Sequence, residues 1–412
     1  MSRYYTQFIK VIFLILGISL TGYASTTESG LIEVKTQGTY QEMKHQVAEL
    51  LDTYEETTEP EVIQLITVGD IMMHEPQISS GYNEKTKTYN YDYMYEEVAP
   101  YLKEGDLTIG NLELTLSGAD QKYTGYPQFN APDAVADALK KVGFDLLTTA
   151  NNHSLDRKFT GLKRTIDVLE KRGLLHTGTY RSKEESQSIL VHEVKGTKIA
   201  FLAYTYGTNG IVVDKGKEYS VNYINQGKIA KDIQIARQKG AELICVSVHF
   251  GVEYMRTPHT AQKQLVDFLV EQGVDIILGS HPHVLQPIEI RERQGKETVI
   301  LYSQGNFISG QRTKYRETSA IFSIFLEKEP LSQKFTVKKV SYIPTWVDYS
   351  MVKGKPNYRI LPAKRAVHLY ELGQDPLISK ADYEKLKGAL KDVREMFKSE
   401  DERIVEQQTF VN

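Results

Sequence analysis

Cysteine is almost absent from this chain of 412 residues, which contains only Cys245. A single cysteine forms neither an internal disulfide nor a thiolate metal cage, so any metal site here must use His, Asp, Glu and Asn. Cys245 lies within the apolar run at residues 243–246. We therefore predict that this thiol is buried and inert.

The chain also lacks a strong excess of charge, because 50 Lys and Arg nearly balance 53 Asp and Glu, giving a net charge of −3. No basic stripe interleaved with aromatic residues is present, so we expect no nucleic-acid partner. Hydrophobic residues make up 41% and charged residues 25% of the chain, which is an ordinary globular composition. The length allows two domains or one large α/β domain with additions.

The apolar run at residues 11–20 is shorter than the about 20 residues that span a bilayer. Arg3 and Lys10 form a positive flank, and Gly22-Tyr23-Ala24 follows the run as a small-x-small cleavage pattern. We therefore predict a signal peptide at residues 1–24 and an exported protein, extracellular or associated with the cell envelope. Cleavage is favoured, and a retained anchor is the alternative. Residues 25–60 are polar and are predicted to form a spacer.

From residue 61 onward, short apolar runs predict buried strands, each followed by a polar cluster. These runs lie at residues 62–68, 106–109, 144–148, 243–248, 274–278 and 299–302. Helices are predicted at 132–142, 160–172, 228–239 and 258–271, each ending near a glycine. Ligands bind beyond the carboxyl ends of strands in α/β sheets, so the six polar clusters should share one sheet edge. Beyond residue 310, strands are predicted at 318–326 and 335–343, and a helical tail from 376 to about 405.

The most informative cluster is Gly279-Ser280-His281-Pro282-His283, which follows the predicted strand at 274–278. Pro282 restricts the backbone and favours an extended conformation at His281. Two neutral imidazoles held in this way suit a divalent metal. An ordinary loop is the alternative for this stretch taken alone.

The other clusters supply further candidate ligands. Asp70 follows the first strand with His74 four residues later, and either a ligand or a turn-capping role suits Asp70. Glu113 is the only acidic residue in its cluster, and a carboxylate can bridge two cations. His249 ends a very apolar strand, where a buried core histidine is the alternative.

A second set of residues suggests chemistry beside the metal. The Asn152 carbonyl oxygen can act as a ligand, and His153 with Asp156 can form an oriented acid–base pair. Gly251 and Glu253, just after His249, favour the edge of a site. The basic run Arg312, Lys314 and Arg316 follows Asn306. A solvated loop explains that run, but over the metal edge it would attract an anionic substrate.

The ordered motifs Gly-Asp-Ile-Met, Gly-Asn-Leu-Glu, Ala-Asn-Asn-His-x-x-Asp, Val-His-Phe-Gly-x-Glu-Tyr, Gly-Ser-His-Pro-His-Val and Tyr-Ser-Gln-Gly-Asn-Phe span roughly residues 62–310. This set closely resembles the CapA family of poly-γ-glutamate capsule-synthesis proteins, a branch of the calcineurin-like metallophosphoesterase superfamily. The resemblance implies a four-layer α/β/β/α sandwich at 61–310 with a dinuclear metal site. Residues 311–412 would complete or decorate the same domain as a C-terminal extension of strands and helix.

The resemblance also implies roles for individual residues. Glu113 would bridge two ions, and the remaining ligands would be Asp70, Asn152, His249, His281 and His283, with His153 in the Asn-His pair. The superfamily's Asp-x-His has Met72 at the histidine position, which leaves only His74 as a substitute. Its second Gly-Asp is Gly110-Asn111 here, with Glu113 following. One or two divalent ions are expected, and Mn, Fe and Zn all suit this ligand set.

These features predict metal-dependent hydrolysis of an anionic substrate in capsule or cell-envelope polymer synthesis, with His153 as general acid. We take the substrate-binding candidates to be Asn111, Glu253, Asn306 and Arg312. The expected partners are an anionic polymer or its precursor and membrane-bound polymer synthase subunits. The alternative is a non-catalytic accessory subunit that binds the polymer or the synthase.

Overall fold

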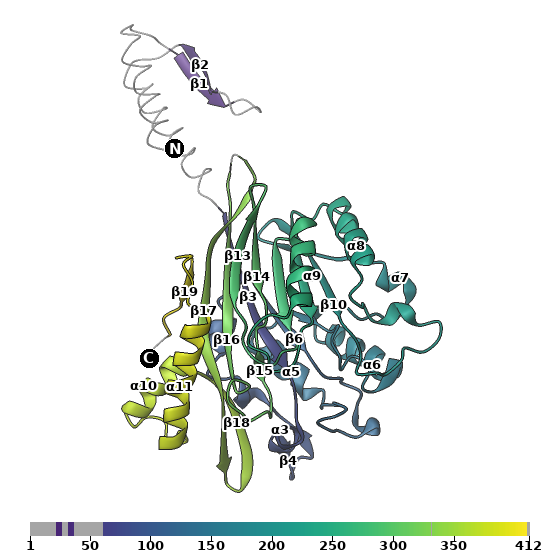
Figure 1. Cartoon of the computed structure of the whole chain (residues 1–412), viewed down its shortest axis with the longest axis vertical. Coiled ribbons are helices and arrows are strands. Elements are labelled where there is room, and N and C mark those ends of the chain that lie inside the picture. Colours follow the sequence, from purple (N-terminus) through teal and green to yellow (C-terminus); the bar gives the residue numbers. More distant parts are fainter. Residues whose placement is uncertain (1–21, 27–31, 37–60, 331, 410–412) are drawn as a thin grey trace. The chain divides into compact units, whose positions relative to one another are not determined.

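The computed structural model describes residues 22–26, 32–36, 61–330 and 332–409 (Figure 1). Most of the predicted signal peptide and of the predicted spacer lies outside these residues. The chain divides into two compact units, residues 1–61 with 328–334 and residues 62–327 with 335–412. In the first unit, β1 (Gly22–Thr26) pairs antiparallel with β2 (Ile32–Thr36). No helix among the described residues is both long and apolar enough to cross a membrane.

The second unit contains two large sheets and a two-stranded sheet of β4 (Tyr82–Asn83) and β5 (Thr88–Tyr89). The larger has the strand order β18-β17-β16-β3-β6-β7-β8, with β15 beside β3 and β19 beside β17. Its strands are β3 (Glu61–Ile71), β6 (Leu107–Leu112), β7 (Leu146–Thr148), β8 (Leu175–Thr177), β15 (Asn306–Ile308), β16 (Thr318–Lys328), β17 (Phe335–Val352), β18 (Lys355–Pro362) and β19 (Ile404–Glu406).

The smaller sheet has the order β13-β14-β12-β11-β10-β9. Its strands are β9 (Leu190–Val194), β10 (Thr197–Thr205), β11 (Leu243–His249), β12 (Ile276–Ser280), β13 (Ile288–Arg293) and β14 (Lys296–Leu301). Strands β10, β11, β12 and β14 run parallel. Every residue of β11 is buried, which explains its nearly continuous apolar sequence.

The four predicted helices are α5 (Ala134–Val142), α6 (Lys158–Lys171), α8 (Gln226–Gln238) and α9 (Thr260–Glu271). Each bound lies within two residues of the predicted one. The glycines that follow these helices all have positive φ, at Gly143, Gly173, Gly240 and Gly273. This left-handed conformation ends a helix and costs glycine little. Shorter helices are α3 (Glu75–Ser80), α4 (Ala99–Leu102) and α7 (Lys183–Ser186).

Three apolar cores stack these elements into layers. The middle core joins the two sheets and contains Leu65, Phe201 and Leu278. A second core packs α5 and α6 on the larger sheet, and a third packs α8 and α9 on the smaller sheet. The predicted four-layer α/β/β/α sandwich is therefore confirmed.

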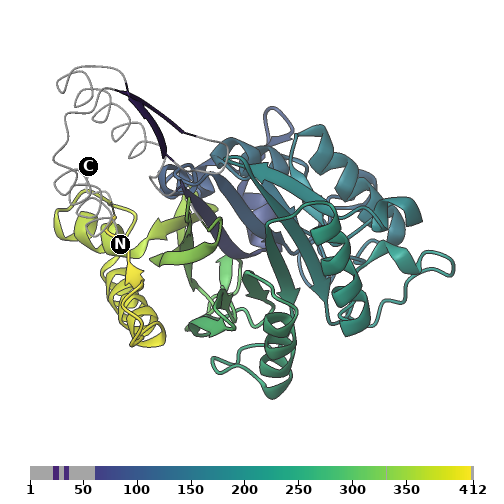
Figure 2. The same cartoon turned by 90° about the horizontal axis from the view of Figure 1, so that it is seen from above.

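The C-terminal residues extend the larger sheet and add two helices, α10 (Ala363–Glu371) and α11 (Lys380–Met396), drawn in yellow-green and yellow in Figure 2. These helices pack against Trp346 and Leu361. The prediction of one helical tail to about residue 405 was wrong at its end. Helix α11 stops at Met396, and Ile404–Glu406 pairs with β17 as a strand because backbone groups of β17 are available there.

Candidate metal centre

The strand ends of both sheets bring six candidate ligands together. Asp70 lies on β3, Glu113 follows β6, and Asn152 lies beyond β7. From the smaller sheet, His249 ends β11, and His281 and His283 follow β12. All six side chains are buried, with exposures of 4% or less. The six clusters were predicted to share the edge of one sheet, but the edge on which they meet joins two sheets.

Two ligand triads share the Glu113 carboxylate. Asp70, Glu113 and His283 form one triad, and Glu113, His249 and His281 form the other. Within each triad the candidate ligand atoms all lie within 4.8 Å of one another. Nitrogen and oxygen donors without thiolate suit a divalent transition metal. Glu113 thus has the position that the sequence resemblance gave to a bridging ligand.

The surroundings of Glu113 provide a test of whether a cation fits. Both carboxylate oxygens are buried, and neither has a hydrogen-bond partner among the described residues. Burial, followed by the charge of Asp70, raises the pKa of Glu113 well above its ordinary value. A buried carboxylate without donors is costly unless it is neutralised or coordinates a metal. The donor set and this unpartnered carboxylate therefore fit one or two divalent ions.

Asp70 has a contrasting environment. Its Oδ1 accepts a hydrogen bond from Asn111 Nδ2 at 2.8 Å, and its Oδ2 lies 3.2 Å from His283 Nδ1. Burial opposes ionisation, but the hydrogen bond and charge of His283 outweigh it and lower the pKa of Asp70. The β3–β6 register shifts just before Asp70, between Thr67 and Asp70. A side chain at Gly69 would place its Cβ 1.9 Å from the Gly305 oxygen, so only glycine permits this close approach.

The imidazoles of the second triad are held neutral. Burial lowers the pKa of His249 and of His281 to about 3. His249 Nε2 lies 2.9 Å from Asn152 Oδ1 and 3.5 Å from Glu113 Oε1. Its Nδ1 contacts the hydroxyl of Ser280 at 2.9 Å, a partner of the kind that orients a ligating histidine. The sequence analysis gave no role to Ser280, although it directly precedes His281.

The other imidazole, His283, behaves differently. Burial lowers its pKa, but Glu113 and Asp70 outweigh that effect and raise the pKa to about 9 in the absence of metal. Its Nδ1 also lies 2.9 Å from Asn306 Oδ1, and its Nε2 lies 3.9 Å from Glu113 Oε1. Two negative carboxylates therefore favour a positive charge at this position, which a bound cation would supply.

The backbone of the His-Pro-His turn differs from the prediction. An extended conformation was expected at His281, but its φ is +98°, and His283 has a φ of +58°. The turn is held by long-range contacts, since His281 N–H donates to Asp70 Oδ2 at 3.3 Å and Pro282 O accepts from Tyr254 N–H at 2.7 Å. Such strained conformations cost about 1–3 kcal/mol each and persist where the surroundings over-determine them.

His153 and Asp156 form a buried pair beside the triads. His153 Nδ1 lies 2.7 Å from Asp156 Oδ2, which also accepts from the Phe129 N–H at 2.6 Å. The Phe129 ring meets the His153 ring edge-on at 4.7 Å. His153 Nε2 points towards Asn209, whose Nδ2 lies 3.5 Å away. The pair therefore has the fixed orientation that acid–base chemistry requires.

The structure does not bring His74 into either triad. Its Nδ1 accepts the Gly310 N–H at 3.1 Å, its backbone precedes α3, and its ring contacts Phe129. Strand β3 ends at Ile71, and the buried residues Met72 and Met73 separate it from His74, which directly precedes α3. We therefore correct the assignment of His74 from metal ligand to helix cap.

Three of the four predicted substrate-binding residues have other roles. Asn111 and Asn306 are buried and hydrogen-bond the candidate ligands Asp70 and His283, so they position ligands. Arg312 donates to the Val347 oxygen and pairs with Glu317 at 3.3 Å. Those partners lie on or beside later strands and were not apparent from the basic run. Glu253 fits the prediction better, since it is exposed and groups with His281 and His283.

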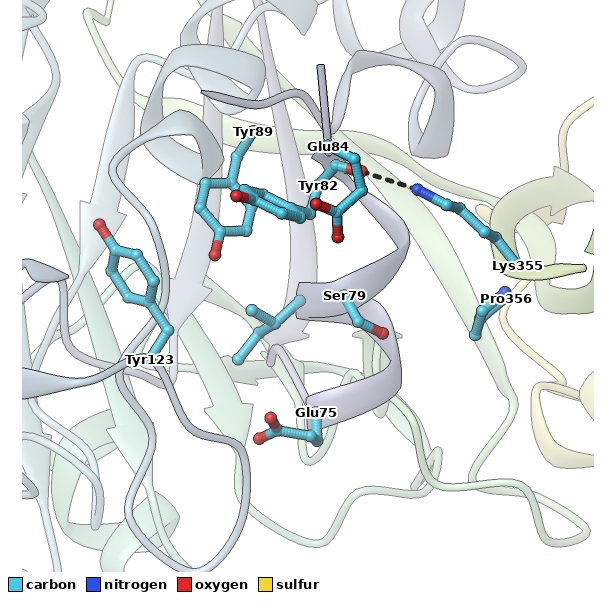
Figure 3. Close-up of a pocket in the computed structure, with 9 residues that line it drawn as sticks. Glu75, Ser79, Tyr82, Glu84, Tyr89, Tyr123, Lys355 and Pro356 are labelled. Carbon is cyan, nitrogen blue, oxygen red and sulfur yellow. Dashed lines mark hydrogen bonds between the residues drawn. The ribbon is translucent and has the colours of Figure 1, made fainter. Parts of the chain in front are cut away.

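The tyrosine-dense stretch at 89–95 is divided between core and surface. Tyr91 and Tyr95 are fully buried in the core. Tyr89 instead lines a surface pocket of about 330 Å³ together with Tyr82 and Tyr123 (Figure 3). The Lys355 ammonium, also at this pocket, donates to the Tyr82 carbonyl at 3.2 Å. None of the candidate metal ligands lines this pocket.

The sequence model of the bacterial capsule synthesis protein family PGA_cap matches residues 64–311. This match covers more than half of the chain and includes all six candidate ligands. The chain belongs to this family. The predicted resemblance to CapA proteins is thereby confirmed.

Two relatives are similar to this chain over much of their length. The capsule biosynthesis protein CapA of Bacillus anthracis is 32% identical over 276 residues, covering 65% of each chain. The match thus spans slightly less than two thirds of that relative. The PGA biosynthesis protein CapA of Bacillus subtilis (strain 168) is 30% identical over 282 residues, covering 66% of this chain and 70% of that protein.

Among solved structures, the calcineurin-like phosphoesterase YfkN from Bacillus subtilis is similar with a TM-score of 0.42 and 12% identity. That similarity covers 82% of this chain and 98% of the other.

Proposed function

We propose that this chain is an exported, metal-dependent hydrolase that acts on an anionic substrate during synthesis of a capsule or related cell-envelope polymer. The observation that carries the proposal is Glu113, a buried carboxylate that has no hydrogen-bond donor among the described residues and that two ligand triads share. Family membership and the names of the Bacillus relatives support the polymer pathway, with poly-γ-glutamate as the candidate product.

The ions would be held by Asp70, Glu113, Asn152, His249, His281 and His283. Divalent metals in such sites polarise a substrate oxygen and lower the pKa of water. Asn111, Ser280 and Asn306 would keep the ligand side chains in position through the hydrogen bonds described above.

His153 is the proposed general acid. Asp156 fixes the His153 ring through Nδ1, so its Nε2 is the atom that would transfer a proton to a leaving group. Asn209 lies within 3.5 Å of that nitrogen and is exposed, so substrate would have to displace or engage its amide. The export part of the proposal rests on the charged flank, apolar run and Ala24 pattern of the N-terminus.

The test combines element analysis with an activity screen. The full chain, purified without chelator, should contain Mn, Fe or Zn and should hydrolyse either a phosphoester or a γ-glutamyl peptide. Chelation should abolish turnover, and the same metal should restore it. Metal binding without turnover, together with co-purification of membrane synthase subunits, would replace hydrolysis with the accessory role. A chain that carries no metal after gentle purification would contradict the metal centre itself.

A further inference from the structure

Arg316 is the one residue of the basic run whose charged group has no protein acceptor among the described residues. Arg312 pairs with Glu317, and Lys314 pairs with Asp392 at 3.3 Å. Arg316 is half-buried, and its guanidinium carbon lies only 3.4 Å from the centre of the Tyr254 ring. This cation–π contact covers one face of the guanidinium and leaves its N–H edge free to donate.

The Tyr254 platform is tied directly to the metal centre. Its backbone N–H donates to Pro282 O within the His-Pro-His turn at 2.7 Å, and its ring centre lies 6.1 Å from that of His283. Tyr254 has a φ of +67°, a strained conformation held by this contact. Its side chain is 41% exposed, so the platform lies at the solvent side of the site.

The backbone of Arg316 provides a second connection to the candidate metal centre. The Arg316 carbonyl accepts a hydrogen bond from Asn306 Nδ2 at 3.0 Å, and Asn306 Oδ1 contacts His283 Nδ1 at 2.9 Å. The same buried amide therefore contacts both the backbone of Arg316 and a candidate metal ligand. An oxyanion bound in two-pronged fashion by the free edge of Arg316 would lie beside the metals.

We propose that Arg316, stacked on Tyr254, is the anion-binding residue of this site and recognises a carboxylate or phosphate group of the substrate. This assignment rests on the proposed function, because it assumes that the site binds a substrate. It also corrects the sequence-based choice of Arg312, whose donors are used within the fold. Both candidate groups present oxygens that match the guanidinium fork, and one is found on a γ-glutamyl polymer and the other on a phosphoester.

Binding to the metal-loaded full chain by calorimetry tests the assignment. The probes are a short γ-linked glutamate oligomer, its neutral analogue with α-carboxamides in place of the free carboxylates, and inorganic phosphate. Arg316→Gln should weaken binding of at least one anion about tenfold or more, because charge-assisted pairs contribute on this scale. Arg316→Lys should bind with an affinity between those of wild type and Arg316→Gln, since lysine keeps the charge but lacks the two-pronged guanidinium. Lys314→Gln removes the same charge two residues away and should bind as wild type does.

The probes separate the sources of the anion. A loss confined to the oligomer identifies a carboxylate, and a loss confined to phosphate identifies a phosphoester; either supports the assignment. Equal affinities in Arg316→Gln and Lys314→Gln for both anions would overturn it, as would equal losses for the neutral analogue. Thermal unfolding and metal content of each variant show that the fold and the ions are retained. Arg316-dependent binding without turnover would reject hydrolysis alone, whereas turnover with an unchanged KM in Arg316→Gln would reject this assignment alone.

Discussion

His249 Nε2 lies 3.5 Å from Glu113 Oε1, although the two residues follow strands of different sheets. The contact joins a neutral imidazole to a carboxylate that accepts no hydrogen bond from the part of the chain that the structure describes. This pairing is what a shared metal requires, and it makes Glu113 the most direct residue to test.

We predict that Glu113→Gln removes bound metal, because a neutral amide with one oxygen cannot replace the anionic carboxylate that both triads share. In chelated protein the same change should stabilise the fold more at pH 8 than at pH 5, since it replaces a buried carboxyl that resists ionisation with a neutral amide. The sign follows from the raised pKa of Glu113, whose contribution to stability is present at low pH and is lost as pH rises. Element analysis and denaturant unfolding measure both effects. Asp120→Asn, at an exposed acid, is the control and should change neither.

The proposed acid role of His153 predicts a separation between metal binding and turnover. His153→Ala should keep its ions and lose roughly 10²–10⁴-fold in turnover, the usual contribution of a positioned acid. His281→Ala should lose both. Asp156→Asn should resemble His153→Ala with a smaller loss, since the ring remains but its orientation weakens. Full restoration of the polymer by His153→Ala in a deletion strain would instead favour the accessory role.

Acid should lower the free energy of unfolding of the chelated protein, because the buried histidines His249 and His281 are neutral in the folded state. The pKa of His249 falls from an ordinary value near 6.5 to about 3 on folding, so the unfolded chain binds its proton first. Stability contributed by neutral His249 is therefore present above pH 6.5 and is lost as pH falls towards 3. Relative to His249→Gln, wild type should lose at most about 1.4 kcal/mol per pH unit across this range. Unfolding curves at pH 7 and pH 5 test this, and a constant difference between the two proteins would contradict it.

The correction at His74 has its own test. His74→Ala should cost about 1–2 kcal/mol of stability, because it removes the acceptor for Gly310 N–H and the contact with Phe129. Metal content should stay at the wild-type level, whereas Asp70→Ala should empty at least one position. Loss of metal in His74→Ala with an unchanged melting temperature would instead show that His74 is a metal ligand.

Local patterns in the sequence were sufficient for several strands and helices and for the candidate ligands that meet at the strand ends, whereas the four layers were predicted from the family resemblance. Apolar runs predicted β3, β11 and β12 because these strands are buried on both faces, and terminal glycines located the helix ends. The phase of the polar residues relative to the strands placed Asp70 and His281 at one edge. These properties depend on neighbours in the chain, which a sequence displays directly.

Contacts between distant segments determined the rest. Arg312 and Arg316 belong to one basic run, and only the positions of Glu317, Val347 and Tyr254 distinguish the paired cation from the free one. The positive φ of His281 likewise depends on Asp70, more than two hundred residues earlier. Sequence spacing carries no signal for such partners.

The candidate ligands are divided between two sheets whose facing side chains, including Phe201 and Leu278, form the middle core. A metal ion bound to the second triad would tie Glu113, from the early part of the chain, to His249 and His281, from the later part. The two sheets could then separate only if the ion were released, so bound metal would stabilise the folded chain. The supply of divalent metal would in that case set the lifetime of the folded chain against proteases as well as its chemistry.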